Sequence, residues 1–242
     1  MDEQTSLKAP SARDRRRKAR EQAILDAAMC IVDEGGERAL TMRSLAKSLD
    51  LSPGAMYRYF DGRDAIIAAL AQRTISGYAQ ALRVREEAAR RHAAGLPESA
   101  QALLVLLSRI ECYWDSSVQD PGGWRLINLF LVDRRRLITG PAHDRLMASV
   151  SAQIQRLAAL CDAAVAVGAL QPGNSMERSL DILAVVHGNL LYIKMALTSP
   201  IPFEPIRTLR STIEAVLLGW GAEAAELGFA WERLRAIDFS EV

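Results

Sequence analysis

The chain has 242 residues, half of them hydrophobic, which is enough to build a sizeable core and excludes a wholly disordered protein. Its 30 basic and 29 acidic side chains nearly cancel, so any affinity for nucleic acid has to come from where the charges lie. Three widely spaced cysteines and a polar N-terminus argue against a disulfide framework, a zinc site and a secretion signal.

Apolar residues recur at spacings of three and four along the whole chain, whereas period-two runs of Val, Ile and Thr are missing. The sequence therefore predicts an all-α protein. Residues 1–19 contain Pro10 and all but the last residue of the run RDRRRKAR, in which like charges repel one another. We expect this segment to be a flexible basic arm, with order beginning near Arg20.

Three helices are predicted next. The first ends at Gly35 and Gly36, because glycine accepts the left-handed geometry of a helix C-terminus. Thr41 is placed to cap the second helix, and Asp50 and Leu51 form a tight turn after it. Ser52 and Pro53 then start the third helix, as N-cap and first helical residue.

A fourth helix is expected from about Arg63 to the Gln80 region or further, joining two domains. We expect a DNA-binding domain over 20–80 and a larger helical domain over 81–242. Further helices are predicted near 97–118, 124–137, 143–167, 176–197 and 205–227, separated by glycine- and proline-containing turns.

Residues 41–60, TMRSLAKSLDLSPGAMYRYF, have the layout of a helix-turn-helix: a short helix, a turn, and a second short helix that opens with small side chains. A recognition helix has to enter a groove only about 12 Å wide, and Gly54 with Ala55 lets the backbone approach closely. Any helical protein contains short amphipathic helices joined by turns, so the layout by itself leaves a purely structural interpretation open.

Residues 20–68 resemble the DNA-binding domain of the tetracycline-repressor (TetR) family, in the order T-x-x-x-[LIV]-A, turn, small residues, L-Y-x-[HY]-F and a basic residue. The matching positions are Thr41, Leu45, Ala46, Gly54, Ala55, Met56, Tyr57, Tyr59, Phe60 and Arg63. The sequence departs from the pattern at Tyr59, where histidine is frequent, and at Asp61-Gly62, which puts a carboxylate close to DNA. Both departures bear on the operator sequence that would be read.

The resemblance implies roles for individual residues. Thr41 would cap a helix and donate to a phosphate, and Arg43 would reach a guanine edge. Tyr57 and Tyr59 would contact phosphates or thymine methyl groups, and Arg63 would take the place of a phosphate-binding lysine. The complete set of expected DNA-binding residues is Thr41, Arg43, Ser52, Gly54, Ala55, Tyr57, Arg58, Tyr59 and Arg63.

The basic arm has the composition of a segment that follows phosphates or enters a minor groove, with a solvated charge run as the alternative. Its basic residues are Arg13, Arg15, Arg16, Arg17, Lys18 and Arg20. If the arm contacts DNA, deleting residues 1–17 weakens operator binding and flattens its salt dependence.

Helix-turn-helix domains usually work in pairs, and the apolar segments Ile182–Leu197 and Ile206–Leu218 are the expected homodimer interface. The resemblance implies the same interface and a cavity for a small-molecule effector. Candidate effector contacts are Glu111, Trp114, Trp124, Asn128, His187 and Tyr192, each of which could equally serve the core.

The function expected from these observations is a cytoplasmic, DNA-binding transcriptional repressor released from its operator by a small molecule. A ligand-independent architectural DNA-binding protein is one alternative. A helical enzyme is another, although the scattered histidines, the missing phosphate loop and the missing metal spacing give it no support. We expect no cofactor, no metal and no membrane span.

Overall fold

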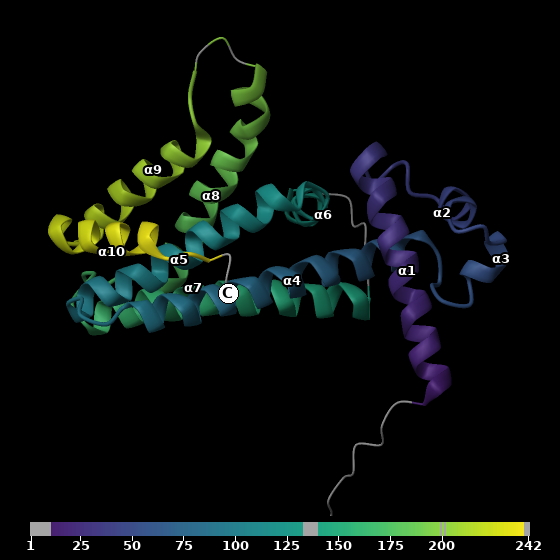
Figure 1. The fold of residues 1–242 in the computed structure, drawn as a ribbon, viewed down its shortest axis with the longest axis horizontal. Helices are drawn as coiled ribbons and strands as arrows, with labels where there is room; N and C mark the ends of the chain where they lie inside the picture. The colour runs from purple at the N-terminus through teal and green to yellow at the C-terminus, as the bar shows by residue number, and fades with distance from the viewer. Residues whose placement is uncertain (1–10, 133–139, 199, 201, 240–242) are drawn as a thin grey trace, which may run out of the picture. The chain divides into compact units, whose positions relative to one another are not determined.

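The protein, described here from a computed structural model over residues 11–132, 140–198, 200 and 202–239, consists of helices joined by turns (Figure 1). Within these ranges no strand occurs, which confirms the all-α prediction. The helices are α1 (Ala12–Gly35), α2 (Met42–Ser48), α3 (Pro53–Met56), α4 (Arg63–His92), α5 (Glu98–Gln119), α6 (Pro121–Val132), α7 (Pro141–Ala166), α8 (Ser175–Thr198), α9 (Pro205–Gly219) and α10 (Ala224–Ala236).

The helices form two compact units, one made of residues up to 73 with 121–144, the other of residues 74–120 with those from 145 onward. The boundary falls inside α4, which continues from one unit into the other without a break. The expected division at residue 80 therefore lies further along the same helix, and α6 joins the first unit although the sequence had grouped it with the second.

In the first unit, α1 packs against α2 and α6, and α2 packs against α3. Ile24, Leu45 and Met56, one from each of the first three helices, are completely buried. Helices of four and seven residues, such as α3 and α2, are too short to be stable alone, so their apolar contacts in this core hold them in place.

Helix α1 begins at Ala12, eight residues before the start expected near Arg20. Ser11 caps it: its Oγ accepts a hydrogen bond of 3.1 Å from the Asp14 N–H, and an Asp14 carboxylate oxygen accepts from the Ser11 N–H at 3.2 Å. One turn later Arg17 pairs with Glu21 at 2.9 Å. Residues 12–19, expected to belong to a flexible arm, are thus helical in the structure, and this cap and ion pair act against the repulsion among the basic side chains.

Helix α5 is the centre of the second unit, in which α8 and α10 pack against it and α9 packs against α8. Leu103, Leu104, Leu106 and Leu107 are all fully buried, although they lie on different sides of the helix. A helix that is apolar all round is one that neighbours cover on every side.

The single helix expected over 205–227 is two helices in the structure, α9 and α10. Gly221 has a φ of 92°, and the Ala222 N–H donates to the Leu217 carbonyl at 3.0 Å, which ends α9. A Cβ at Gly221 would lie 2.5 Å from the Gln171 side chain, so the turn also requires glycine for space. The helix expected over 124–137 is α6, and residues 133–139 lie outside the described part of the chain.

Helix α8 is long and apolar enough to cross a membrane, with a mean hydropathy of 1.4 over an 18-residue window of which 24% is buried. The sequence-based expectation of no membrane span considered uninterrupted apolar runs, and α8 contains polar residues such as His187 and Asn189 within it. The mean hydropathy of the same helix over 18 residues is nevertheless high enough for a membrane span. Much of its apolar surface is thus uncovered by the rest of the chain.

The three cysteines occupy different environments. Cys30 is exposed on α1, whereas Cys112 on α5 and Cys161 on α7 are buried, and all three are free thiols. Burial raises the pKa of Cys161 to about 11 and also raises the pKa of Cys112.

Candidate nucleic-acid interface

The helix-turn-helix starts at Thr41, the N-cap of α2. Its Oγ1 accepts a hydrogen bond of 2.9 Å from the Ser44 backbone N–H, and Ser44 Oγ accepts from the Thr41 N–H at 2.9 Å. This reciprocal pair is a capping box and confirms the expected cap. Thr41 and Arg43 are both exposed, so their polar groups are accessible at the start of α2.

A Schellman motif forms the turn between α2 and α3. The Leu51 N–H donates to the Ala46 carbonyl at 2.9 Å, and the Asp50 N–H donates to the Lys47 carbonyl at 3.3 Å. Asp50 has a φ of 52°, the left-handed conformation that glycine usually takes at this position. The tight turn expected at Asp50 and Leu51 is confirmed, and these bonds fix the direction in which α3 leaves α2.

Helix α3 is one turn long and is positioned from both ends. Ser52 Oγ accepts from the Ala55 N–H at 3.3 Å and Pro53 is the first helical residue, as expected from the sequence. Met56, fully buried, anchors the other end in the core of the first unit. The helix therefore presents its start to solvent while its end is held.

Gly54 lies at this exposed start. A Cβ added there would meet no heavy atom within 4 Å, and Gly54 has no positive φ, so neither packing nor backbone conformation requires glycine. The missing side chain leaves open space outside the unit. A binding partner that packs against the start of α3 could occupy that space.

Polar side chains follow directly after α3. Tyr57 is 58% exposed and Arg58 is exposed, whereas Ala55 and Tyr59 are half-buried. The hydroxyl and guanidinium groups of Tyr57 and Arg58 are thus available on the same unit as Arg43. The structure brings the expected DNA-binding residues into one unit, but their contact with DNA stays a prediction.

Arg63 has a role that the sequence did not predict. Its Nε–H donates to the Leu40 carbonyl at 2.7 Å and its Nη2 donates to the Glu37 carbonyl at 2.6 Å. Its side chain is 31% exposed, and Nη1 lies 3.6 Å from Asp64. The guanidinium therefore braces the loop between α1 and α2, and only part of it remains for a phosphate.

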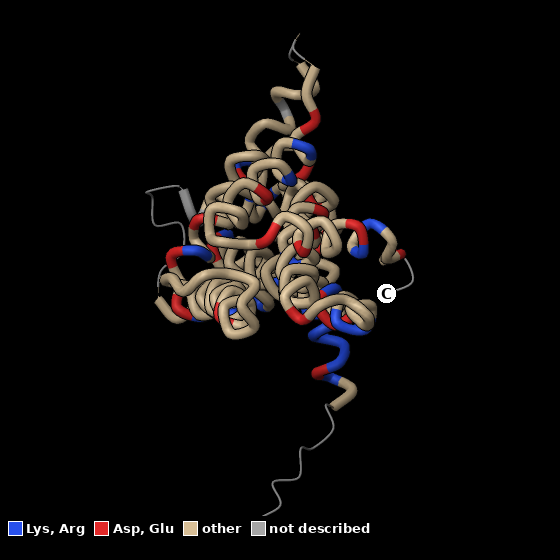
Figure 2. The backbone as a smooth tube through the Cα atoms, turned by 90° about the vertical axis from the view of Figure 1, so that its left-hand side faces the viewer, with Lys and Arg blue, Asp and Glu red and all other residues tan. Residues whose placement is uncertain are grey.

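The first turns of α1 are the most basic segment of the described chain, visible in Figure 2 as the blue stretch that follows the grey N-terminal trace. The side chains of Arg13, Arg15, Arg16 and Lys18 are exposed. Because these residues are helical, their charges are held at fixed spacings along one rigid element. Such a helix can lie along a phosphate backbone without losing much conformational freedom on binding.

The residues expected to contact an effector are divided between the two units. Trp124 and Asn128 belong to α6 in the first unit, whereas the other four belong to the second. Trp114 is buried in the core around α5, and Tyr192, 46% exposed, stacks edge-on against Phe203 with ring centroids 6.3 Å apart.

Two of the six take part in contacts between helices. Glu111 accepts from Arg210 Nε at 2.5 Å, which joins α5 to α9, and His187 shares a hydrogen bond of 2.7 Å with the Tyr113 hydroxyl, which joins α5 to α8. Burial lowers the pKa of His187. These contacts support packing roles for Glu111 and His187, and their contact with an effector stays a prediction. In the part of the chain that the structure describes, no group of three His, Cys, Asp or Glu could hold a metal ion.

Comparison with known proteins places the helix-turn-helix in a family. Residues 24–70 match the family model "Bacterial regulatory proteins, tetR family". A 56-residue stretch is 38% identical to the HTH-type transcriptional repressor KstR of Rhodococcus jostii, covering 23% of this chain and 26% of that protein. The KstR of Mycobacterium tuberculosis is 33% identical over 73 residues, covering 30% of this chain and 31% of that protein. The aligned parts thus span about a quarter and a third of these curated relatives.

Solved structures share the fold over most of the chain. A tetR-family regulatory protein from Rhodococcus RHA1 superposes with a TM-score of 0.63 at 18% identity, covering 84% of this chain and 97% of that one. The ketosteroid transcriptional regulator KstR2 of Mycobacterium tuberculosis gives a TM-score of 0.56 at 15% identity, covering 84% and 96%. At these identities the likeness establishes the all-helical fold.

Proposed function

Residues 24–70 form a DNA-binding domain of the tetR family, and from this premise we propose that the protein is a DNA-binding transcriptional regulator. The relatives that match this domain are repressors by name, and repression is the direction we propose here. It would act in the cytoplasm, where the DNA is.

One observation carries the proposal: the start of α3 is exposed and has space where a side chain would otherwise stand. Gly54 is not needed by the protein's own packing, and Tyr57 and Arg58 follow it with exposed polar groups. A recognition helix has to meet these requirements, because its N-terminal residues lie against base edges in the major groove. An architectural DNA-binding protein with no effector is the alternative, favoured by the basic surface of α1.

Selection of bound DNA from a random pool, followed by footprinting, tests the proposal. We expect one enriched sequence with two half-sites about 34 Å apart, because the two domains of a dimer bind the major groove at positions one helical turn of DNA apart. Enrichment of no sequence above the random pool would contradict a sequence-specific regulator. Binding of all sequences with equal affinity and a steep salt dependence would favour the architectural alternative.

The pairing of two domains would use α8 and α9. Leu180 and Leu191 on α8 and Leu218 on α9 are 50%, 64% and 40% exposed, and the two helices pack against each other within one chain. A second copy that lays the same two helices on this surface would cover the apolar side chains and form a four-helix interface. The second copy of the chain would also supply the second helix-turn-helix that a palindromic operator needs.

A small molecule would regulate DNA binding by favouring the conformation that binds the operator less well. It can do so only by as much as its affinity differs between the two conformations. Thermal-shift screening with candidate metabolites tests this part, because a ligand of the folded protein raises the unfolding temperature. A regulator that no metabolite stabilises would act without an effector.

A further inference from the structure

A cleft of about 550 Å³ lies in the second unit, where the second half of α4 faces α5 and α7. This volume lies within the range of small-molecule sites in proteins. Four arginines line the cleft, Arg83 and Arg90 from α4, Arg109 from α5 and Arg156 from α7, against two carboxylates, Glu86 and Glu87. None of the six residues expected to contact an effector lines it. The cleft is thus basic and distinct from the residues that the sequence predicted as effector contacts.

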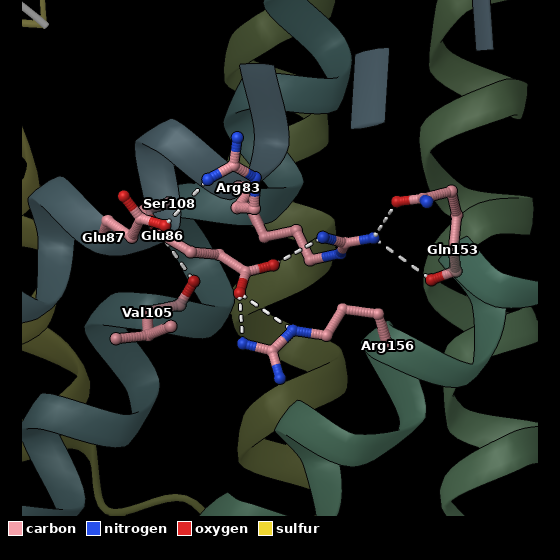
Figure 3. A network of polar contacts seen from close by, with 8 residues as sticks. Arg83, Glu86, Glu87, Val105, Ser108, Gln153 and Arg156 are labelled. Atoms are coloured by element: carbon pink, nitrogen blue, oxygen red, sulfur yellow. Dashed lines mark hydrogen bonds and ion pairs between the residues drawn. The ribbon is translucent and has the colours of Figure 1, made fainter. Parts of the chain in front are cut away.

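Glu86 forms the centre of its floor and is shared by two guanidinium groups (Figure 3). Arg109 Nη1 donates to Glu86 Oε1 at 2.5 Å, and Arg156 donates to Oε2 through Nε at 3.0 Å and Nη2 at 2.6 Å. Both carboxylate oxygens are therefore engaged. The cluster holds two positive charges and one negative charge, so one positive charge is left over.

The surplus charge lies on Arg156, beside a buried pair that is itself neutral. The side chains of Arg109 and Glu86 are 6% and 4% exposed, and Arg109 Nη2 donates to the Gln153 carbonyl and to Gln153 Oε1, both at 3.1 Å. Because Glu86 already compensates the buried Arg109, the second guanidinium, Arg156, keeps a net positive charge at the side of the cleft that faces solvent. The amide of Gln153 supplies hydrogen bonds but no charge.

The edge of the cleft does not supply the missing negative charge. Glu87 pairs with Arg83 at 3.2 Å, and that pair is neutral. Arg90 forms no ion pair with another described residue, and Arg156 is 47% exposed, with its Nη1 making no hydrogen bond within the described part of the chain. Both guanidinium groups therefore have donors that an anion from outside the chain could accept.

We infer that this cleft binds a small organic anion, with its carboxylate or phosphate group held by Arg156 and Arg90 above the Glu86 and Arg109 floor. Guanidinium groups match the oxygens of both anions with paired, charge-assisted hydrogen bonds. Ala79 and the aliphatic part of Gln80 offer the apolar surface for the rest of the ligand. We take this anion to be the effector, and that step rests on the proposed function. The binding of an anion in the cleft does not depend on the proposed function.

Isothermal titration calorimetry of the full chain at constant ionic strength tests the site, with phenylacetate, phenyl phosphate and the neutral phenylacetamide as probes. We expect one or both anions to bind, and the amide to bind about tenfold more weakly or worse, because it lacks the charge-assisted bonds. The comparison of the two anions shows which group the site takes. Equal binding of anion and amide, or no heat from either anion at millimolar concentration, overturns the inference.

Variants separate binding from a structural role. Arg156→Gln leaves Glu86 paired with Arg109 and should weaken anion binding about tenfold or more, whereas Arg207→Gln, an exposed change on α9 away from the cleft, should leave it unaltered. Glu86→Gln removes the competing carboxylate and should strengthen anion binding even if it lowers the unfolding temperature. A loss of anion binding in Glu86→Gln protein that still folds would contradict the proposed site.

Operator binding is measured separately, on DNA from the selection experiment. The Arg156→Gln protein should bind that DNA as the unaltered protein does, but phenylacetate or phenyl phosphate, whichever binds, should no longer weaken the complex. If the anion binds and no operator is found, only the proposed regulatory function fails. If an operator is found and neither anion binds, only the cleft assignment fails.

Discussion

Arg63 donates its Nε–H to the carbonyl oxygen of Leu40 across 2.7 Å, which ties the first residue of α4 to the loop that leads into α2. A second bond to the Glu37 carbonyl makes the guanidinium a two-pronged brace. The residue that resembles a phosphate contact in the sequence is thus also part of what positions the helix-turn-helix.

Replacing Arg63 with glutamine should lower the free energy of unfolding by about 1–3 kcal/mol, because it removes charge-assisted hydrogen bonds to two loop carbonyls. Urea denaturation measures this change. The slope of log affinity for DNA against log salt concentration should stay as it is. A slope that falls by about two, one for each chain of the proposed dimer, with unaltered stability would instead make Arg63 a phosphate contact.

Replacing Gly54 with alanine should leave the folded protein as stable as before, or stabilise it by up to about 1 kcal/mol, since alanine is the better helix former and the added methyl has space. Operator affinity should nevertheless fall, because the methyl would meet the DNA. The matched control is Gly77→Ala, an equally open glycine inside α4. Equal operator affinity of both variants would remove the start of α3 from the interface.

The basic start of α1 should contribute to DNA binding through charge. Changing Arg13 and Arg16 together to glutamine should reduce the salt slope of operator affinity by about four in the proposed dimer, roughly one for each phosphate that is no longer neutralised by the two chains. Unlike a deletion of residues 1–17, this double change keeps the Ser11 cap intact. Changing the exposed Arg91 and Arg235 to glutamine alters net charge equally, and an equal reduction in that protein would mean that only overall charge matters.

The proposed dimer should depend on the apolar surface of α8. Leu191→Glu puts a charge where the second copy would pack, and we expect monomers in sedimentation or light-scattering measurements together with weaker operator binding. Phe229→Glu, on α10 and 47% exposed, is the control and should remain dimeric. Association of the unaltered protein with lipid vesicles, abolished in Leu191→Glu, would show instead that a membrane covers this helix.

Stability should fall on the acid side of neutrality because of His187. Burial lowers the pKa of this histidine in the folded chain, whereas in the unfolded chain it takes up a proton near pH 6.5. The contribution is therefore complete above about pH 6.5 and is lost as the pH falls from there towards the folded pKa. Urea midpoints measured from pH 7.5 down to 5 should show a smaller decline in His187→Gln than in the exposed control His143→Gln.

The sequence predicts the helix-turn-helix closely because its signals are local. Caps at Thr41 and Ser52, the turn at Asp50 and the glycines ending α1 each act within a few residues, and the structure shows every one of them. The same holds for α5, α7 and α8, whose bounds lie within two residues of those expected.

Contacts between distant residues could not be predicted in this way. The brace from Arg63 spans 23 residues to Leu40, and the arginines around Glu86 come from helices that only the fold brings together. Arg109, a charge inside the apolar run LLVLLSRIECYW, was a signal for the cleft in the sequence. The partners of Arg109 could not be identified from the sequence. The turn at Gly221 has a local signal, a glycine with a positive φ, which the prediction of one helix over 205–227 overlooked, and a further constraint beside Gln171 that only the fold shows.

The exposed thiol of Cys30 gives the protein a built-in attachment point. At neutral pH the two buried cysteines are shielded and protonated, so a maleimide dye should modify one position in each chain, on the second half of α1. In a symmetric pair the two dyes would report one distance between the DNA-reading units. Energy transfer between the dyes would measure the distance between the two DNA-reading units. The measurement can be made with and without an anion in the arginine-lined cleft, and the protein needs no substitution for it.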